Sequence, residues 1–348
     1  MALTAEQVKQ KARELGADAV GIAGAAVLNA HPPDPKFPQT PERISPEIKS
    51  VVAIVKRIPA GAFRTKQAEC VQYMDQLVLR EMDKVCMRVA QFLETEGTYA
   101  FPLASQETKW EFKRASYGYL SGRHVAIEAG LGTMGLEVNF LSPEFGPRCY
   151  TSAVLTTAEL EADQKLTRQV CIGETCSRCL YSCPADAVLH WGIDKRECAQ
   201  LAQEFGYSVM LSQLQKFIRA PDSAARLQAL CTPQAYAVWQ GLLRVVGAFG
   251  DCPRCLEVCP VGEDYVQWLA DEHREIPEKN TEKVTLAKQM QADRKAGKDL
   301  PGLSDWNIRW VGEEGYVPPK KRSALGAQQS AADQGRGDRP VAPTTEGV

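Results

Sequence analysis

The sequence lacks the features of an exported or membrane-bound protein. Its first residues, MALTAEQVKQ, contain neither the apolar core of a signal peptide nor a twin-arginine motif. No run approaches the roughly 20 apolar residues that a helix needs to cross a bilayer. We therefore expect a cytoplasmic protein with no membrane partner.

An excess of charge is lacking as well. The formal net charge is −2, so the chain has no overall attraction for polyanions, and nucleic acid is not expected as a partner. The apolar fraction of 44% and the charged fraction of 24% are those of an ordinary globular protein. A length of 348 residues predicts two domains, or one large domain with an inserted module.

Cysteine, in contrast, is abundant, with twelve residues in the chain. A disulfide framework is not expected, because the cytoplasm is reducing and a chain of this length does not need covalent staples. The cysteine content therefore points to thiolate–metal chemistry.

Several helices and strands can be predicted from local patterns. A capping box at Thr4 predicts a helix that ends near Leu15. Apolar runs predict buried strands at 19–23 and 51–55, and apolar residues at spacings of three and four predict a core-facing helix over 70–95. An apolar helical stretch is expected over about 208–249, and a disordered tail from about 323.

Two cysteine runs end in the same pattern, C-x2-C-x3-C-P, which is the second half of the bacterial two-cluster ferredoxin signature. In that signature the cysteine before proline ligates the other cluster. We therefore expect two [4Fe–4S] clusters with crossed ligands. The first set is Cys171, Cys176, Cys179 and Cys259, and the second is Cys183, Cys198, Cys252 and Cys255.

Two of these ligands are less firmly placed than the others. Cys198 competes with Cys231, which is nearer to Cys252 in sequence but lies in a helical stretch. Cys171 precedes Cys176 by a gap of four residues where the signature has two.

Zinc is the alternative metal for paired C-x2-C motifs, and the two C-P endings favour clusters. Cys70, Cys86 and Cys149 are expected to be ordinary buried residues.

The segment before the cysteine runs carries a second signature. It contains Ala129-Gly-Leu-Gly132-Thr-Met-Gly135, then Ser142-Pro-Glu-Phe-Gly-Pro-Arg148, and it precedes Val154-Leu-Thr-Thr157. This arrangement resembles the corrinoid-dependent reductive dehalogenases and their relatives, the epoxyqueuosine reductases. The resemblance extends over about residues 5–265 and is strongest over 123–260.

The resemblance implies a mixed α/β (α+β) fold, with a nitroreductase-like cofactor domain followed by a two-cluster ferredoxin-like module. The corresponding divisions are a cofactor domain at 1–165, the cluster module with a helical insertion at 166–265, a C-terminal extension packed on the core at 266–322, and the tail at 323–348.

The resemblance also implies base-off cobalamin that receives electrons from the clusters. Gly130, Gly132 and Gly135 suit close backbone approach to such a bulky cofactor, although turn geometry alone is the alternative. The epoxyqueuosine reductases have an acidic aspartate upstream, where this chain has Ser116 or Tyr117.

Dehalogenases use a tyrosine assisted by a basic residue. The candidate proton donors are therefore Tyr117 and Tyr119, with Arg148 or Arg123 as the basic partner. His124 is expected to be a helix residue and not a ligand.

These observations predict a reductive dehalogenase-like oxidoreductase that acts on a small organic substrate, with a ferredoxin or flavodoxin as electron donor. Three alternatives remain. They are an electron-transfer protein or redox-complex subunit without corrinoid, an epoxyqueuosine reductase-like tRNA-modifying enzyme, and a reductase that activates another corrinoid enzyme.

Overall fold

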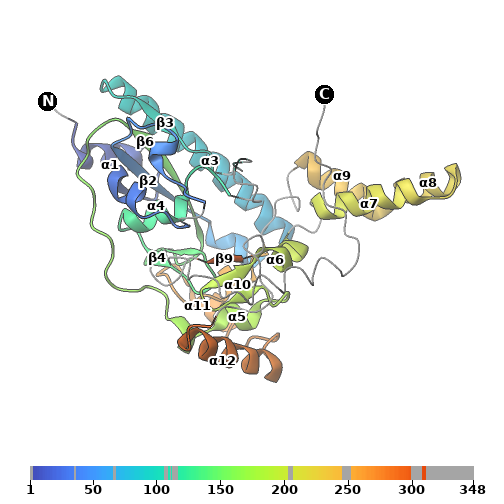
Figure 1. Ribbon diagram of the computed structural model, residues 1–348. Coiled ribbons are helices and arrows are strands. Elements are labelled where there is room, and N and C mark those ends of the chain that lie inside the picture. Colours follow the sequence, from blue (N-terminus) through green and yellow to red (C-terminus); the bar gives the residue numbers. More distant parts are fainter. Residues whose placement is uncertain are drawn as a thin grey trace.

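The computed structural model describes residues 3–34, 37–65, 68–105, 109, 111, 117–202, 207–244, 252–298 and 308–310 (Figure 1). Helices and strands are mixed along this part of the chain, which confirms the predicted fold class. In the described ranges, no helix combines the length and the apolar character that a bilayer span requires. The predicted tail at 323–348 lies outside the described residues.

The core of the N-terminal part is a four-stranded sheet in the order β1-β2-β6-β3, with every pairing antiparallel. Its strands are β1 (Ala19–Gly24), β2 (Ser50–Arg57), β6 (Cys149–Thr156) and β3 (Ala100–Pro102). The predicted strands at 19–23 and 51–55 are confirmed. The central strand β2 is an apolar run because both of its faces are covered.

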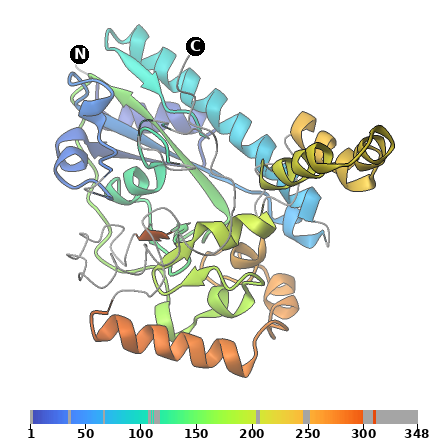
Figure 2. The same cartoon turned by 45° about the vertical axis from the view of Figure 1, so that its right-hand side comes forward.

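Alternate residues of β2 face different helices, as the two-residue period of a strand requires. Val51, Ala53 and Val55 pack toward α4 (Gly122–Glu128). Val52 and Ile54 pack toward α1 (Ala5–Glu14) and the long helix α3 (Ala68–Thr95), which runs along the sheet (Figure 2). The result is a sheet with helices on both faces.

The predicted helices of this part are confirmed. Thr4 caps α1 through the expected capping box with Gln7. The apolar stripe of α3 is the face that packs on the sheet, with Met82, Val85 and Val89 buried. Shorter elements complete the domain: α2 (Ala25–Ala30), the 3-10 turns Pro41–Arg43 and Ala60–Arg64, β4 (Thr133–Met134) and β5 (Phe140–Leu141).

The cysteine-rich module consists of short elements. They are a 3-10 turn at Gly173–Thr175, α5 (Arg178–Ser182), β7 (Val188–Leu189), β8 (Gly192–Asp194), α6 (Lys195–Ala202), α10 (Arg254–Glu257), α11 (Gln267–Glu272), α12 (Thr281–Lys295) and β9 (Ile308–Trp310). Helix α12 packs on this module through Ala287 and Met290. Its Lys283 also pairs with Asp186 at 2.7 Å.

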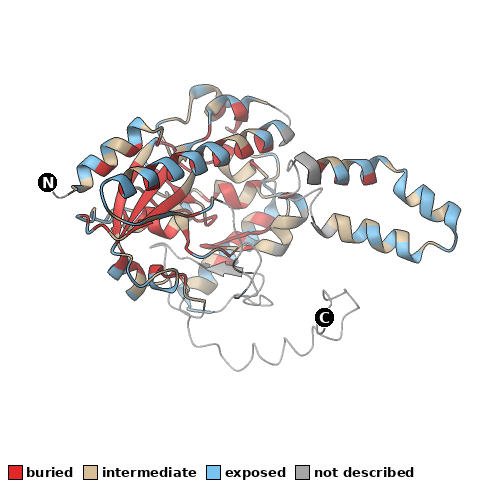
Figure 3. Ribbon diagram, turned by 90° about the horizontal axis from the view of Figure 1, so that it is seen from above, coloured by how far each residue is buried: buried red, intermediate tan, exposed pale blue. Residues whose placement is uncertain are grey.

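Between α6 and Cys252 the chain forms a projecting group of three helices, here named the helical arm (residues 207–244, Figure 3). Sequence patterns predicted one helical stretch, but the arm divides into α7 (Tyr207–Arg219), α8 (Ser223–Leu230) and α9 (Pro233–Arg244). Asp222 caps α8 by accepting a hydrogen bond from the Ala225 amide at 2.8 Å. Pro233 starts α9, where a missing N–H has no cost.

Arg148 joins the sheet to the module. It is fully buried beside β6, and its guanidinium pairs with Asp264 at 2.7 Å. It also donates to the carbonyls of Leu256, Cys259 and Val261 at 3.0, 2.9 and 2.7 Å. Gly146 and Gly262 lie against each other at this joint, where a side chain on Gly146 would overlap the Val261 carbonyl.

Replacing Arg148 with methionine should therefore cost about 3–5 kcal/mol of stability, because a buried carboxylate and three carbonyls lose their partner. The measurement is the urea midpoint of the cluster-loaded protein under anaerobic conditions. Arg13→Met is the matched control, because Arg13 pairs with Glu6 on the exposed surface of α1 and should contribute at most about 1 kcal/mol. Equal midpoints for the two variants would contradict this role.

Candidate iron–sulfur centre

The first predicted ligand set is brought together from both cysteine runs. Burial is the main cause that raises the pKa of Cys179 well above its ordinary value, followed by Glu137 and then by the thiols of Cys259, Cys255 and Cys171. The Cys176 thiol likewise raises the pKa of Cys171. Cys259 and Cys255 of the second run therefore both lie near Cys179 of the first run, and Cys259 also lies near Cys171.

The second predicted set is also brought together. The pKa of Cys255 is raised first by burial, then by Glu137, and then by Cys252, Cys198 and Cys183. Cys198 lies on α6, directly after strand β8. The competing Cys231 is exposed at the end of α8 in the helical arm.

Three of the cysteine sulfurs have N–H groups directed at them. The Gly173 amide donates to Cys171 Sγ and the Ala187 amide to Cys183 Sγ, both at 3.3 Å. The Asn139 side-chain amide lies 3.7 Å from Cys255 Sγ. Such donors stabilise negative charge on sulfur, so the environment suits thiolates bound to iron.

Within the described residues, no group of three or more His, Cys, Asp or Glu side chains is arranged to hold a metal ion. A [4Fe–4S] cube makes a different demand, since each of its four thiolates binds a different iron and the sulfurs need not converge on one point. The two cysteine sets are compatible with that arrangement.

The cysteines outside the two sets differ among themselves. Cys86 and Cys149 are buried as expected, and burial raises the pKa of each to about 12. Cys70 is exposed, so the expectation that it is buried is wrong. It lies near the start of α3.

Glu137 was not anticipated by the sequence reasoning. Its carboxyl group is only 3% exposed, and burial raises its pKa to about 7. It is the second-largest cause that raises the pKa of Cys179 and Cys255, so it faces both cysteine sets. A carboxylate within the apolar, glycine-rich segment before the cysteines was the signal that could have identified it.

The three glycines predicted to face a cofactor face the protein itself. A Cβ on Gly130 would overlap the Gln164 carbonyl, and one on Gly132 would lie 2.6 Å from the Phe140 ring. At Gly135 it would lie 2.6 Å from the Glu137 carboxylate. Gly130 also has a φ of +73°, which favours glycine. Chain packing therefore accounts for these glycines without a cofactor.

The two candidate tyrosines have different environments. Tyr117 is buried, and its hydroxyl donates to the Phe37 carbonyl at 3.2 Å. Tyr119 is 41% exposed, with Lys109 Nζ located 4.3 Å from its ring centre. Tyr119 is therefore the one that solvent or a substrate can reach. Ser116 lies outside the described residues.

The basic partners proposed for these tyrosines have other roles. The N–H groups of Arg148 are directed at Asp264 and at the carbonyls of Leu256, Cys259 and Val261, so a catalytic role for Arg148 does not fit its position. Arg123 donates to the Val138 carbonyl in the loop between β4 and β5. His124 lies on α4 as expected, with its Nε2 located 2.9 Å from the His31 carbonyl.

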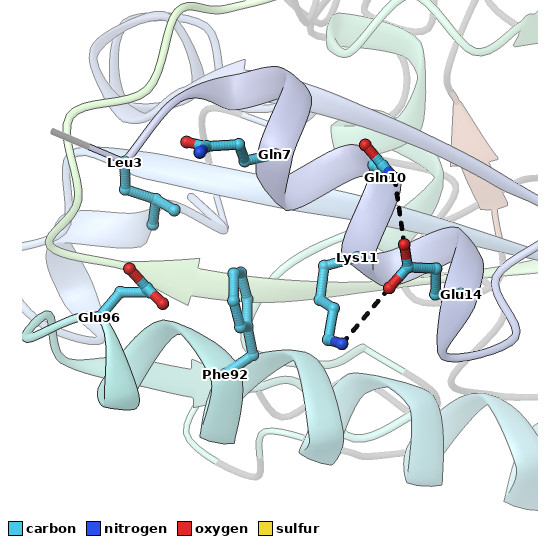
Figure 4. A pocket seen from close by; sticks show the side chains of 7 residues that line it. All are labelled: Leu3, Gln7, Gln10, Lys11, Glu14, Phe92 and Glu96. Carbon is cyan, nitrogen blue, oxygen red and sulfur yellow. Dashed lines mark hydrogen bonds and ion pairs between the residues drawn. The ribbon is translucent and has the colours of Figure 1, made fainter. Parts of the chain in front are cut away.

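Two hollows on the described surface lie away from these residues. One, of about 200 Å³, is lined by residues of α1 and α3 together with Leu3 (Figure 4). Its polar side chains bind each other, since Glu14 accepts from Gln10 at 3.1 Å and from Lys11 at 3.3 Å. The other lies on α12. Neither hollow is lined by a residue expected to hold a corrinoid.

No family model matches the chain. Among curated relatives, the epoxyqueuosine reductase of Prochlorococcus marinus is 28% identical over 205 residues, which cover 53% of this chain and 62% of the relative. That of Gloeobacter violaceus is 26% identical over 220 residues, covering 57% and 65%. The tetrachloroethene reductive dehalogenase of Dehalobacter restrictus is 29% identical over 147 residues, covering 41% and 24%.

Solved structures of both groups are also similar. An epoxyqueuosine reductase with a tRNA-Tyr stem loop has a TM-score of 0.47 and 20% identity, covering 74% of this chain and 65% of that one. A catabolic reductive dehalogenase has a TM-score of 0.44 and 18% identity, covering 70% and 36%.

The predicted resemblance to this superfamily is confirmed by the curated relatives. The chain spans less than two thirds of the length of the two epoxyqueuosine reductases described above.

The packing of the glycine segment can be tested directly. Gly132→Ala should destabilise the protein by about 1–3 kcal/mol without any added corrinoid, because the new methyl group overlaps Phe140 and Leu141. Gly61→Ala is the matched control, since no atom lies within 4 Å of its Cβ position. If Gly132 instead served a cofactor, the variant would unfold at the wild-type urea concentration and would lose only cofactor binding.

Proposed function

We propose that this chain is an iron–sulfur reductase that holds two [4Fe–4S] clusters and delivers their electrons to a substrate bound at the sheet domain. The observation that supports the proposal is the gathering of buried thiols from both runs, with Cys259 and Cys255 near Cys179, and with Cys183 and Cys198 near Cys255. In this proposal, residues 166–265 hold the clusters and residues 1–165 bind the substrate.

The clusters, when bound, store and transfer one electron each. The chain contributes the eight thiolates and the amide donors at Cys171, Cys183 and Cys255. Arg148 holds the Cys259 carbonyl, so it positions the cysteine that crosses from one run to the other set. Deep burial of Cys179 and Cys255 excludes water from the sulfurs.

We assign Cys198, and not Cys231, as the fourth ligand of the second cluster. Anaerobically reconstituted wild-type protein should contain about eight iron and eight sulfide per chain. Cys198→Ser should lower both toward about four or give a spectroscopically altered second cluster, because one thiolate is lost. Cys231→Ser is the matched control and should retain full iron content. Loss of iron from Cys231→Ser alone would reverse the assignment.

The substrate is proposed from the relatives. The first five curated relatives are all epoxyqueuosine reductases, which favours an epoxyqueuosine reductase-like reaction over the dehalogenase-like reaction that the sequence first suggested. Reducing an epoxide takes two electrons, and two one-electron clusters match that requirement. The expectation that nucleic acid is not a partner is therefore not kept.

Reductive dehalogenation is the second candidate. It is favoured by the segment Ser142-Pro-Glu-Phe-Gly-Pro-Arg148 and by the tetrachloroethene reductive dehalogenases among the relatives. Cleavage of a carbon–halogen bond also consumes two electrons. Both candidates require a proton donor, for which exposed Tyr119 is the proposed residue.

Cobalamin is the other cofactor that the resemblance implies. Gly130, Gly132 and Gly135, which were expected to cradle cobalamin, do not fit that role, because other atoms of the chain already occupy the space beside each of them. Uptake of cobalamin by the protein is measured in the experiment that follows.

The test uses the cluster-loaded protein with a low-potential donor under anaerobic conditions, with and without base-off cobalamin. Its substrates are tRNA that contains epoxyqueuosine and, separately, a halogenated organic compound. Queuosine formation, followed by mass spectrometry of tRNA nucleosides, is the expected result. Halide release in its place would favour the second candidate.

Two further readings complete this test. A base-off cobalt(II) signal in EPR would establish a corrinoid site outside the glycine segment. Clusters that are reduced and reoxidised with no product from either substrate would contradict the proposal and leave an electron-transfer protein. Tyr119→Phe should lower the rate of product formation at unchanged iron content, while Tyr73→Phe, an exposed tyrosine on α3, should not.

A further inference from the structure

The helical arm exposes apolar side chains in pairs along its helices. Among the described residues, six of the fifteen most exposed large hydrophobic side chains lie on this arm. They are Leu214, Ile218, Leu227, Leu230, Tyr236 and Trp239. Each successive pair is separated by three or four residues, so its members share one face of their helix. Ile218 is 72% exposed and Trp239 is 60% exposed, so most of the surface of these two side chains is not packed against the arm itself.

The same arm is basic although the whole chain is slightly acidic. Between residues 209 and 241 the charged residues are Lys216, Arg219 and Arg226 against a single anion, Asp222. All three cations are exposed, and none forms an ion pair within the described part of the chain. Residues 209–241 of the arm therefore carry a net charge of +2, and Arg244 at the end of the arm adds one more cation, while the chain as a whole has a net charge of −2. Its surface combines apolar contact area with positive charge that no internal partner neutralises.

The arm is inserted between two cysteines of the second set. Cys198 lies in the helix before it and Cys252 lies soon after it, so each end of the arm is fewer than ten residues from a proposed ligand. A chain of that length spans at most about 30 Å. A protein that docks on the base of the arm is thereby brought near the second cluster.

We propose that the helical arm is the docking surface for an acidic, one-electron carrier protein that reduces the second cluster. This inference rests on the proposed function, because a carrier is required only if the clusters are present. Weak redox complexes bury less than about 1,200 Å², with charges that steer the encounter and apolar residues that hold it. A projecting arm with a few large apolar side chains and three unpaired cations matches that description.

Two other occupants are disfavoured by the same surface. Pairing with the arm of a second copy would bring like charges together, since an isologous contact sets each surface against itself. An RNA would need a denser set of cations than three in this segment, and it gains little from aliphatic residues such as Leu214 and Ile218.

The experiment measures cluster reduction by stopped-flow absorbance in the full-length, cluster-loaded protein. The reductants are reduced flavodoxin, as the acidic carrier, and dithionite, as a small reductant that needs no docking surface. The arm variant is K216E/R219E/R226E, and a second variant, I218S/W239S, removes apolar contacts without changing charge. The matched control is R80E/K84E/R88E on α3, which changes the net charge by the same amount on another exposed helix.

The charge variant should lower the second-order rate constant with flavodoxin by about tenfold or more, and should remove its decrease with rising salt. The apolar variant should lower it at all salt concentrations. The α3 control should change it less than threefold, and dithionite should reduce all four proteins at one rate.

Equal flavodoxin rates in the wild type and both arm variants would overturn the proposal. It would also be overturned if the arm variants lost only tRNA binding, or only a dimeric state in light scattering, while keeping the flavodoxin rate. Absence of iron from the reconstituted wild type is a separate result, which would contradict the proposed function itself.

Discussion

The guanidinium of Arg148 connects the two halves of this molecule. Arg148 is the last residue before β6 and is fully buried, and its guanidinium contacts Asp264, the Leu256 carbonyl of α10, and the Cys259 and Val261 carbonyls of the loop that follows. A buried cation is tolerated only when its donors and its charge are matched, so the loop can take only the positions that satisfy all of these contacts. The close approach of Gly146 and Gly262 follows from this joint. So does the position of Cys259 beside the first cysteine run.

The grouping of the cysteines has a thermodynamic consequence. Burial raises the pKa of Cys179, Cys255 and Cys259 well above the ordinary value, and Glu137 adds to the effect. Without iron these thiols stay protonated, whereas iron binding requires thiolates and releases protons. Assembly of the proposed clusters would therefore be coupled to folding of the module, with the N–H groups directed at the sulfurs supplying part of the stabilisation.

The helical arm projects from the rest of the described structure (Figure 3). Its helices contact one another, as in the hydrogen bond from Gln213 to Gln234, while their outer faces carry exposed apolar residues. The chain thus combines a closely packed cysteine-rich module with an arm whose outer apolar side chains are exposed.

Local patterns in the sequence determined the helices and strands, and they predicted the chemistry. The capping box of α1, the apolar run of β2 and the stripe of α3 predicted their structures because each depends on near neighbours in the chain. The spacing of the cysteines likewise predicted the crossed sets, since ferredoxin-type loops have a local geometry. The sequence also indicated the superfamily through the segment around Gly132.

Only the tertiary structure decided what the remaining residues do. Arg148 and Gly132 had been assigned to a reaction and a cofactor, yet long-range contacts place them in packing, because their neighbours come from distant parts of the chain. Glu137 was missed for the same reason, since its importance depends on cysteines that follow it by many residues. The sequence left Cys198 and Cys231 as alternatives for the proposed fourth ligand, and the fold favours Cys198, which lies near Cys255, whereas Cys231 is exposed on the arm.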